Sequence, residues 1–228
     1  MRTTRSLRRA RLAIVATLCL VGPPTLGAQQ SAGIAGDYDV RGSNPGGTGG
    51  YRGNLLIQPT GDTYRFTWET GGPSPVAGIG IRRGEAVVVS YGDASCGAML
   101  YGRGANNSLV GNWSTIGNTT VGSEIAMPVP NQPLGEFTVM GTNPGGGAPP
   151  YRGKMTFRIT GPTFTIRWDV GERVYTGIGV RLGEAFGVAY GASGCGVALY
   201  DIMPDGSLKG AWALRGQTDV GTETATRR

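Results

Sequence analysis

The sequence predicts an all-β protein made of two similar domains. A stretch that begins Gly-Asp-Tyr-Asp-Val-Arg-Gly-Ser-Asn-Pro-Gly-Gly at Gly36 returns at Gly135 as Gly-Glu-Phe-Thr-Val-Met-Gly-Thr-Asn-Pro-Gly-Gly. About 40 of roughly 90 aligned positions are identical, which indicates an internal duplication. Each copy consists of short runs of alternating apolar and polar residues, separated by Gly, Pro, Asn and Asp, a pattern typical of half-buried antiparallel strands. The 42 glycines of the chain disfavour long helices.

Eight strands are predicted in the first copy, near residues 36–42, 51–58, 63–70, 76–82, 85–91, 96–102, 108–115 and 119–126. Their short connections make consecutive strands antiparallel neighbours, so each copy is expected to be a meander. About eight such strands can close into a small up-and-down β-barrel, which leaves no sheet edge exposed. A flattened β-sandwich is the alternative.

The N-terminus has the layout of a secretory signal peptide over residues 1–28. Five arginines flank the start of an apolar run from Leu12 to Val21, and Leu26-Gly27-Ala28 offers a small-residue cleavage site after about Ala28. The apolar run, at about ten residues, is too short to cross a bilayer. The mature protein is therefore expected to be secreted or periplasmic, without a membrane span.

Charge and composition exclude several classes of function. The signal contains five of the 21 basic residues and no acidic one, which leaves a mature net charge of about +1 and no support for a nucleic-acid partner. The chain has no histidine, which removes His-dependent triads, His general bases and His metal sites. We therefore expect no metal, no cofactor and no enzymatic activity.

The two copies define the expected domain boundaries. Residues 34–126 are predicted to form one β-barrel and residues 134–226 a second. Between them, residues 127–133 read Met-Pro-Val-Pro-Asn-Gln-Pro. Three prolines in seven residues disfavour both helix and strand and indicate a short, semi-rigid linker between the domains.

Cys96 and Cys195, the cysteines of the mature chain, occupy equivalent places in the two copies. In an oxidising compartment they could form a disulfide that holds the copies together about a pseudo-twofold axis. The pattern favours the alternative, in which each free thiol packs as a small hydrophobe at the start of an apolar strand.

Candidate ligand-binding residues come from features that both copies retain. The loop Ser43-Asn44-Pro45-Gly46-Gly47 and its twin at 142–146 could offer backbone N–H groups to a ligand, or could simply be a turn in which Asn and Gly take left-handed angles. The repeated aromatic residues could ring an open barrel end or fill the core. The candidate set is Asn44, Tyr51, Arg52, Trp68, Trp113, Asn143, Tyr151, Arg152, Trp168 and Trp212.

Carboxylates recur at four pairs of equivalent positions, which are Asp37/Glu136, Glu69/Asp169, Glu85/Glu184 and Glu124/Glu223. They are expected on outward faces or at strand ends, with Glu85 and Glu184 paired to Arg82 and Arg181 across a hairpin. A glycosidase would need two carboxylates facing one cleft.

The repeated motifs Gly-Asp-Tyr-x-Val-x-Gly, Tyr-Arg-Gly, Gly-Ile-Gly and Ser-Leu-x-Gly-x-Trp resemble a group of small secreted bacterial β-rich repeat proteins that are often labelled fibronectin-binding-like. The resemblance covers both copies and implies a fold and an export route more than an activity. In strand number and in its Gly-x-Trp strands, the chain is more loosely similar to avidin and lipocalin barrels. It lacks their recognisable ligand-contact motifs, so neither ligand is implied.

These observations predict a non-enzymatic tandem-repeat binding protein. Its partner would be a small apolar molecule or sugar, or an extracellular protein. One alternative is a structural, envelope-associated protein with no ligand pocket, and another is an unusual carboxylate-dependent hydrolase. Aromatic and polar groups common to both copies would converge at a barrel mouth only under the binding hypothesis.

Overall fold

Residues 33–228, the part that the computed structural model describes, form sixteen antiparallel strands and three short 3-10 segments. The predicted signal peptide lies outside these residues. Every strand expected in the first copy is present within a few residues of its predicted bounds, and the second copy repeats the set. The strands are β1 (Gly36–Ser43), β2 (Gly50–Pro59), β3 (Tyr64–Glu69), β4 (Val76–Arg83), β5 (Ala86–Tyr91), β6 (Gly97–Arg103), β7 (Leu109–Thr115), β8 (Gly122–Pro128), β9 (Glu136–Thr142), β10 (Tyr151–Ile159), β11 (Thr163–Val170), β12 (Arg173–Leu182), β13 (Ala185–Tyr190), β14 (Gly196–Ile202), β15 (Leu208–Leu214) and β16 (Gly221–Arg227).

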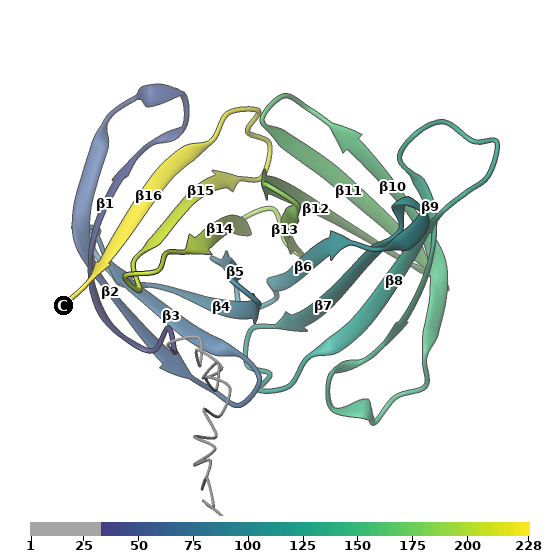
Figure 1. Cartoon of the computed structure of the whole chain (residues 1–228), viewed down its shortest axis with the longest axis horizontal. Helices are drawn as coiled ribbons and strands as arrows, with labels where there is room; N and C mark the ends of the chain where they lie inside the picture. Colours follow the sequence, from purple (N-terminus) through teal and green to yellow (C-terminus); the bar gives the residue numbers. More distant parts are fainter. Residues whose placement is uncertain (1–32) are drawn as a thin grey trace, which may run out of the picture. The chain divides into compact units, whose positions relative to one another are not determined.

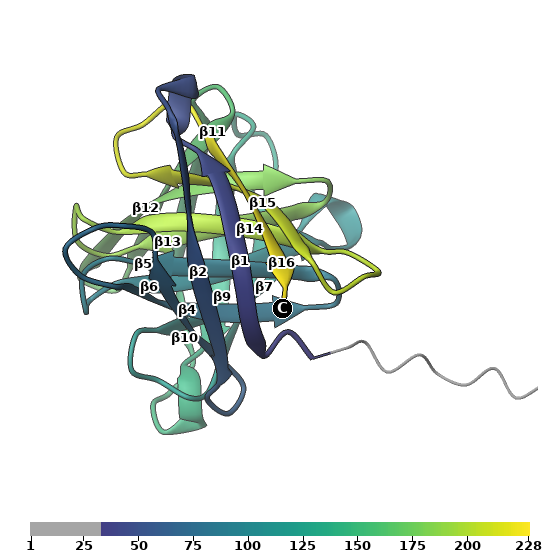
Figure 2. The same cartoon turned by 90° about the vertical axis from the view of Figure 1, so that its left-hand side faces the viewer.

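The strands close into two eight-stranded barrels, as predicted, and not into sandwiches. The first barrel has the order β1-β16-β15-β14-β5-β4-β3-β2, and the second has the order β10-β11-β12-β13-β6-β7-β8-β9. In Figure 1 the C-terminal strands, coloured from yellow-green to yellow, complete the barrel that contains the purple β1. Figure 2 looks at the wall of this barrel, where β16 lies next to β1.

The assignment of one barrel to each repeat, over 34–126 and 134–226, is wrong. β5 does not pair with β6, the next strand of its own repeat, but with β14 of the other repeat, and β13 pairs with β6. Each barrel therefore takes five strands from one repeat and three from the other. The exchange is physically accessible because β6 and β14 are equivalent strands that share Gly, Leu and Tyr at three of seven positions and are apolar over their first five residues, so either can continue the sheet beside β5.

The proline-rich segment does not separate the two barrels. β8 and β9, which precede and follow it, are hydrogen-bonded neighbours in the second barrel, with Pro128 opposite Phe137. The segment 129–135 is thus the turn of a hairpin. The chain passes between the barrels at two other places, the segments 92–96 and 191–195.

A disulfide joins these two crossover segments. Cys96 and Cys195 are bonded, with their Cα atoms 5.6 Å apart and 99 residues apart in sequence. The segments also lie against each other elsewhere, since a side chain on Gly92 would meet the carbonyl oxygen of Gly194. The expectation that the two cysteines are free thiols is therefore wrong, and the bridge cross-links the chain where it changes barrels.

The barrels share an apolar cluster along their contact. It contains Ile79, Ile81, Val88, Cys96, Ala98, Leu100, Ile178, Val180, Ala189, Cys195, Val197, Leu199 and Ala213. In β5, Val87 and Val89 point into the first barrel while Val88 belongs to this shared cluster, so the strand is buried on both faces. Such strands lack polar alternation, because neither face meets water.

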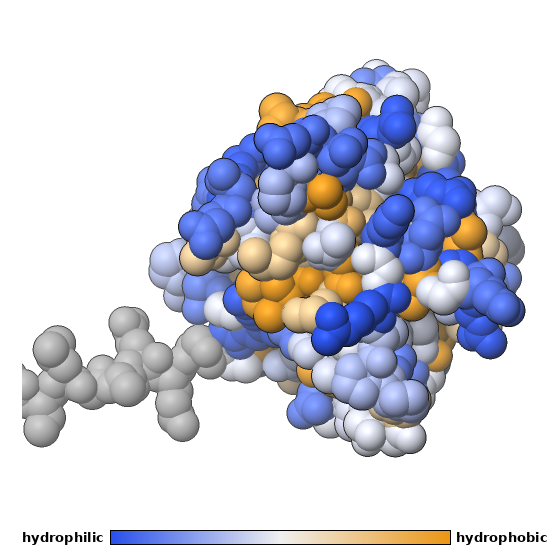
Figure 3. All heavy atoms as spheres, turned by 90° about the vertical axis from the view of Figure 1, so that its right-hand side faces the viewer, coloured by the Kyte–Doolittle hydropathy of each residue, from blue (hydrophilic) through white to orange (hydrophobic). Residues whose placement is uncertain are grey.

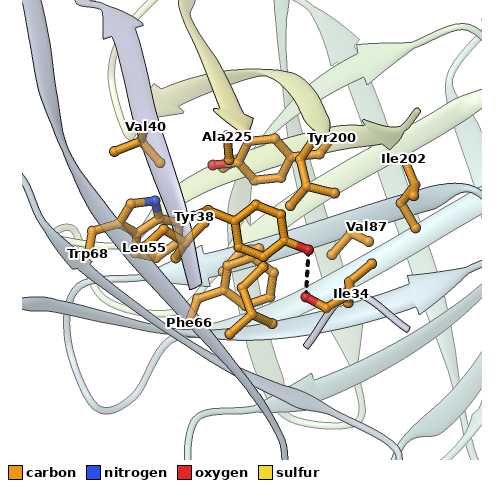
Figure 4. Packing of buried hydrophobic residues seen from close by; sticks show 14 residues of the cluster. Ile34, Tyr38, Val40, Leu55, Phe66, Trp68, Val87, Tyr200, Ile202 and Ala225 are labelled. Atoms are coloured by element: carbon orange, nitrogen blue, oxygen red, sulfur yellow. Dashed lines mark hydrogen bonds between the residues drawn. The ribbon is translucent and has the colours of Figure 1, made fainter. Parts of the chain in front are cut away.

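Each barrel is packed solid at one end. In the first barrel Ile34, Phe66, Val87 and Ile202 fill the interior around Tyr38, whose hydroxyl donates to the carbonyl oxygen of Ile34 at 2.9 Å (Figure 4). In the second barrel three phenylalanine rings fill the corresponding end, with Phe157 stacked on Phe164 at 4.2 Å between centroids and Phe186 edge-on to both. Because hydrophobic side chains fill this end, the opposite end of each barrel is the one at which a site can form.

The repeated Asn-Pro-Gly-Gly loops are turns at this opposite end. The 3-10 segments Pro45–Gly47 and Pro144–Gly146 carry glycines with positive φ, as predicted. The prediction of a left-handed angle for the asparagine is wrong, because Asn44 and Asn143 have extended backbones with φ of −72° and −83°. The loop geometry turns both asparagine residues toward the barrel mouth, where they line the cavities described next.

Candidate functional site

Each barrel contains a cavity at the end opposite its packed core. The cavity of the first barrel has a volume of about 330 Å³ and that of the second about 240 Å³. In the first barrel it lies where β1, β3, β5 and β15 end and where β4 begins. The lining there is Asn44, Tyr51, Trp68, Thr70, Val76, Tyr91, Ala198, Tyr200, Trp212, Leu214 and Glu223. In the second barrel it is Met99, Trp113, Thr115, Glu124, Asn143, Tyr151, Trp168, Val170, Tyr175 and Tyr190.

The two cavities are the same site built twice. All ten positions that line the second cavity have their sequence equivalents in the lining of the first. Six of these ten pairs are identical: Asn44/Asn143, Tyr51/Tyr151, Trp68/Trp168, Tyr91/Tyr190, Trp113/Trp212 and Glu124/Glu223. The four that differ are Met99/Ala198, Val76/Tyr175, Thr70/Val170 and Thr115/Leu214, so the retained part is the asparagine, the glutamate and four aromatic positions.

A buried glutamate lies at the base of the second cavity. Glu124 is 2 % exposed, and its carboxylate accepts hydrogen bonds from three side chains. Tyr151 donates to Oε2 at 2.8 Å, while the Trp168 indole donates to Oε1 at 3.1 Å and the Tyr101 hydroxyl donates to the same oxygen. The carboxylate is therefore held in one orientation by donors on three different strands.

The first cavity repeats this network with equivalent residues. Glu223 is 5 % exposed and accepts from Tyr51 at 2.7 Å, from Trp68 at 3.0 Å and from Tyr200 at 2.7 Å. Figure 4 shows Trp68 and Tyr200 entering the first barrel from opposite walls. Because the same three donors recur in both barrels, the glutamate network is a feature of the repeat and not an accident of one copy.

A glycine in the adjacent strand makes each network possible. Gly141 lies directly between Tyr151 and Glu124 in the sheet, and Gly42 lies between Tyr51 and Glu223. A side chain on Gly141 would lie 2.5 Å from the carbonyl oxygen of Ser123 and closer still to the ring of Tyr151. The missing side chain thus leaves the space through which the tyrosine reaches across the strand to the carboxylate.

Burial governs the protonation of the site. Desolvation raises the pKa of the Glu124 carboxyl, an effect that the hydrogen bonds from its three donors oppose. Desolvation, reinforced by the nearby glutamate charge, also raises the pKa of Tyr101, Tyr151 and Tyr200 well above the ordinary value. These phenols therefore keep their protons at neutral pH and remain hydrogen-bond donors.

Aromatic rings form the walls of both cavities. In the second barrel Trp113 lies edge-on to Tyr151 and Tyr190, with centroids 6.1 and 6.3 Å apart, and Trp168 lies 5.9 Å from Tyr190. In the first barrel Tyr51 is edge-on to Trp212 at 6.2 Å and Trp68 to Tyr91 at 5.8 Å. Such edge-on contacts fix the orientation of the rings that line the cavities.

Strand exchange brings both repeats into each site. Glu124 belongs to the first repeat, but two of its donors, Tyr151 and Trp168, belong to the second. Glu223 of the second repeat is held in turn by Tyr51 and Trp68 of the first. Neither repeat alone carries a complete site of the kind observed.

Eight of the ten predicted ligand-binding residues line the cavities, four in each barrel: Asn44, Tyr51, Trp68 and Trp212 in the first, and Trp113, Asn143, Tyr151 and Trp168 in the second. Their binding of a ligand remains a prediction. Arg52 and Arg152 do not line these cavities, because each follows its tyrosine on the outward face of the strand and has an exposed side chain.

The two glutamates were not predicted as site residues. Glu124 and Glu223 were expected on outward faces or at strand ends, and this is wrong because both are buried inside the barrels. A signal was present in the alternation of β8 and β16. On the face of these strands that carries Gly, Glu and Ala, the residues are identical in both copies, whereas on the other face Ser and Ile of the first copy are replaced by two threonines in the second.

The ion pairs across the two hairpins were predicted correctly, with Arg82–Glu85 at 3.7 Å and Arg181–Glu184 at 3.3 Å.

The outer surface of the second barrel is less polar than that of the first. Figure 3 shows hydrophobic side chains among hydrophilic ones on the side that faces right in Figure 1. On β8 and β9, Ile125, Met127 and Met140 are each more than 40 % exposed, and Ile125 lies directly opposite Met140. The first barrel has Thr224, Thr226 and Arg41 at the equivalent places, so this patch is not part of the duplicated site.

No family model, curated protein or solved structure matches the chain. Across residues 33–228, no helix has the length and apolar character needed to cross a membrane. The duplicated cavities are then the observation from which a function can be inferred.

Proposed function

We propose that the protein is a secreted or periplasmic binding protein, without enzymatic activity, that holds one small ligand in the mouth of each barrel. The observation that carries this proposal is the retention of the same six polar and aromatic residues around two separate cavities. Outward positions such as Arg65/Thr165 and Asn54/Lys154 have meanwhile diverged. Core packing alone does not require these six residues to be retained, since the packed ends of the two barrels, opposite the cavities, are filled by different residues.

The chemistry of the cavities also supports binding over the alternatives. Ligand sites are typically concave, largely apolar and equipped with a few oriented polar groups. Both cavities combine aromatic walls with one oriented carboxylate and one asparagine. A structural protein has no use for a buried charge at a barrel mouth, because burial of an ionised carboxylate costs stability. Hydrolysis of a glycoside generally uses a pair of carboxylates, whereas each described cavity is lined by a single one.

Ligand stoichiometry tests this proposal. A thermal-shift screen of sugars, small organic cations and lipids should identify a compound that stabilises the chain, since a ligand at 100 times its Kd adds about 2.7 kcal/mol. Isothermal titration should then give two sites per chain. Trp113→Ala and Trp212→Ala should each leave one site, and the double variant none, because each removes one wall of one cavity.

Tyr64→Ala is the matched control, because Tyr64 is a partly buried aromatic residue that lines neither cavity. It should leave both sites intact. If no class of compound stabilises the protein, or if the tryptophan variants bind with unchanged stoichiometry, the proposal is wrong and the structural alternative is favoured.

A further inference from the structure

The hydrogen-bond pattern favours the ionised form of the glutamate in each cavity. An indole N–H can only donate, and the phenols around the carboxylates remain protonated and donate as well. Both oxygens of Glu124 accept from such donors, and so do both oxygens of Glu223. Hydrogen bonds from three donors stabilise the ionised form of each carboxyl, and at Glu124 they lower the pKa against the opposing effect of desolvation, so the arrangement favours the anion.

No basic side chain of residues 33–228 lines the cavities to offset this negative charge. Their linings contain neither lysine nor arginine. The salt bridges found within residues 33–228 involve other carboxylates, each of them on the exposed surface. Three hydrogen bonds stabilise each carboxylate, but they do not neutralise it. Each cavity therefore presents a net negative charge to whatever enters.

The aromatic walls, like the glutamate, favour a positively charged ligand. The face of an aromatic ring carries negative electrostatic potential, and rings grouped around a space attract cations, most strongly when water is excluded. Trp113, Trp168, Tyr151, Tyr175 and Tyr190 surround the second cavity, and Trp68, Trp212, Tyr51 and Tyr91 surround the first. Apolar groups on the ligand would also be favoured, since little polar surface is available to hydrogen-bond with a sugar.

We propose that each barrel mouth binds a small organic cation that carries apolar substituents, such as a quaternary or tertiary ammonium group. This inference rests on the proposed binding function and names its ligand class. Cavities of about 240 and 330 Å³ suit a headgroup of this size. Anionic ligands are disfavoured by the glutamate, and neutral ligands of the same shape gain only the apolar part of the interaction.

The test compares choline with 3,3-dimethylbutan-1-ol, in which carbon replaces the charged nitrogen. Isothermal titration of the full disulfide-bonded chain should show choline binding at two sites, with an affinity at least about tenfold above that of the neutral analogue. In Glu124→Gln/Glu223→Gln, which keeps the side-chain shape, choline affinity should fall at least about tenfold and the preference for choline should largely disappear.

Glu85→Gln/Glu184→Gln is the matched control, because it removes two carboxylates from exposed equivalent positions. It should keep the preference for choline, which would exclude a long-range effect of net charge. Equal affinities for choline and its neutral analogue in the unmodified chain would overturn the cation inference but leave the binding function intact. If neither compound binds, the cation inference is also overturned, and the screen for other ligands decides the binding function separately.

Discussion

Replacement of both Cys96 and Cys195 by alanine is expected to lower the free energy of unfolding by about 4–5 kcal/mol. The disulfide closes a loop of 99 residues, and a cross-link of this span removes that order of conformational freedom from the unfolded chain. The disulfide also joins the two segments through which the chain passes between the barrels. It therefore constrains every unfolding route that separates the barrels. Urea unfolding monitored by tryptophan fluorescence measures the change.

The single variants provide the control for the cross-link. Either alanine alone removes the disulfide, so each single variant, measured under reducing conditions, should lose nearly as much stability as the double variant. Reduction of the unmodified chain should have a comparable effect. A loss below about 1 kcal/mol in the double variant, or single losses that add up to the double, would mean that the sulfur atoms act only as buried packing groups.

Gly141→Ala is expected to cost about 3–5 kcal/mol and to eliminate binding in the second barrel alone. The new methyl group would overlap the ring of Tyr151 and the carbonyl oxygen of Ser123. Overpacking of this kind costs about 1–3 kcal/mol, and displacement of the tyrosine also removes a hydrogen bond to a charged group, worth about 1.5–3 kcal/mol. Urea unfolding gives the stability change, and isothermal titration should show one site remaining.

Gly147→Ala serves as the comparison in the same loop region. Gly147 has φ of −76° in the right-handed helical region, and no atom lies within 4 Å of the position that its side chain would occupy. This variant should change stability by less than about 1 kcal/mol and keep both sites. If Gly141→Ala behaves like Gly147→Ala, the packing of Tyr151 against the backbone at Gly141 is not required for the site.

The individual strands could be predicted because their signal is local. Alternation such as Tyr64-Arg65-Phe66-Thr67-Trp68 fixes which face is buried wherever the strand finds its partner. Retention of the same pattern in two copies fixed the strand number and favoured closure into barrels. The same comparison singled out Trp68/Trp168 and Trp113/Trp212, which are held in both copies, but it left open whether these rings fill the core or surround a barrel mouth.

The exchange of strands could not be predicted in this way. β6 and β14 are equivalent strands with Gly, Leu and Tyr at the same places and other apolar residues between them, so local pairing preferences do not clearly distinguish the two partners. Val87-Val88-Val89, which has apolar residues on both faces, indicates only that β5 is buried on both sides, and Val88 lies in the cluster between the barrels. This signal predicts a contact between barrels but not which strand pairs with β5. The glutamates were missed because a carboxylate is usually exposed, and only the three donors around each explain its burial.

A double-mutant cycle tests whether each site joins a carboxylate of one repeat to aromatic donors of the other. The cycle combines Glu124→Met with Tyr151→Phe and, in parallel, with Tyr51→Phe, and measures the free energy of unfolding. The exchanged barrels predict a coupling of about 1–3 kcal/mol between Glu124 and Tyr151, and less than about 0.5 kcal/mol between Glu124 and Tyr51. Coupling of Glu124 to Tyr51 in place of Tyr151 would contradict the account, because it would mean that each repeat closes its own barrel.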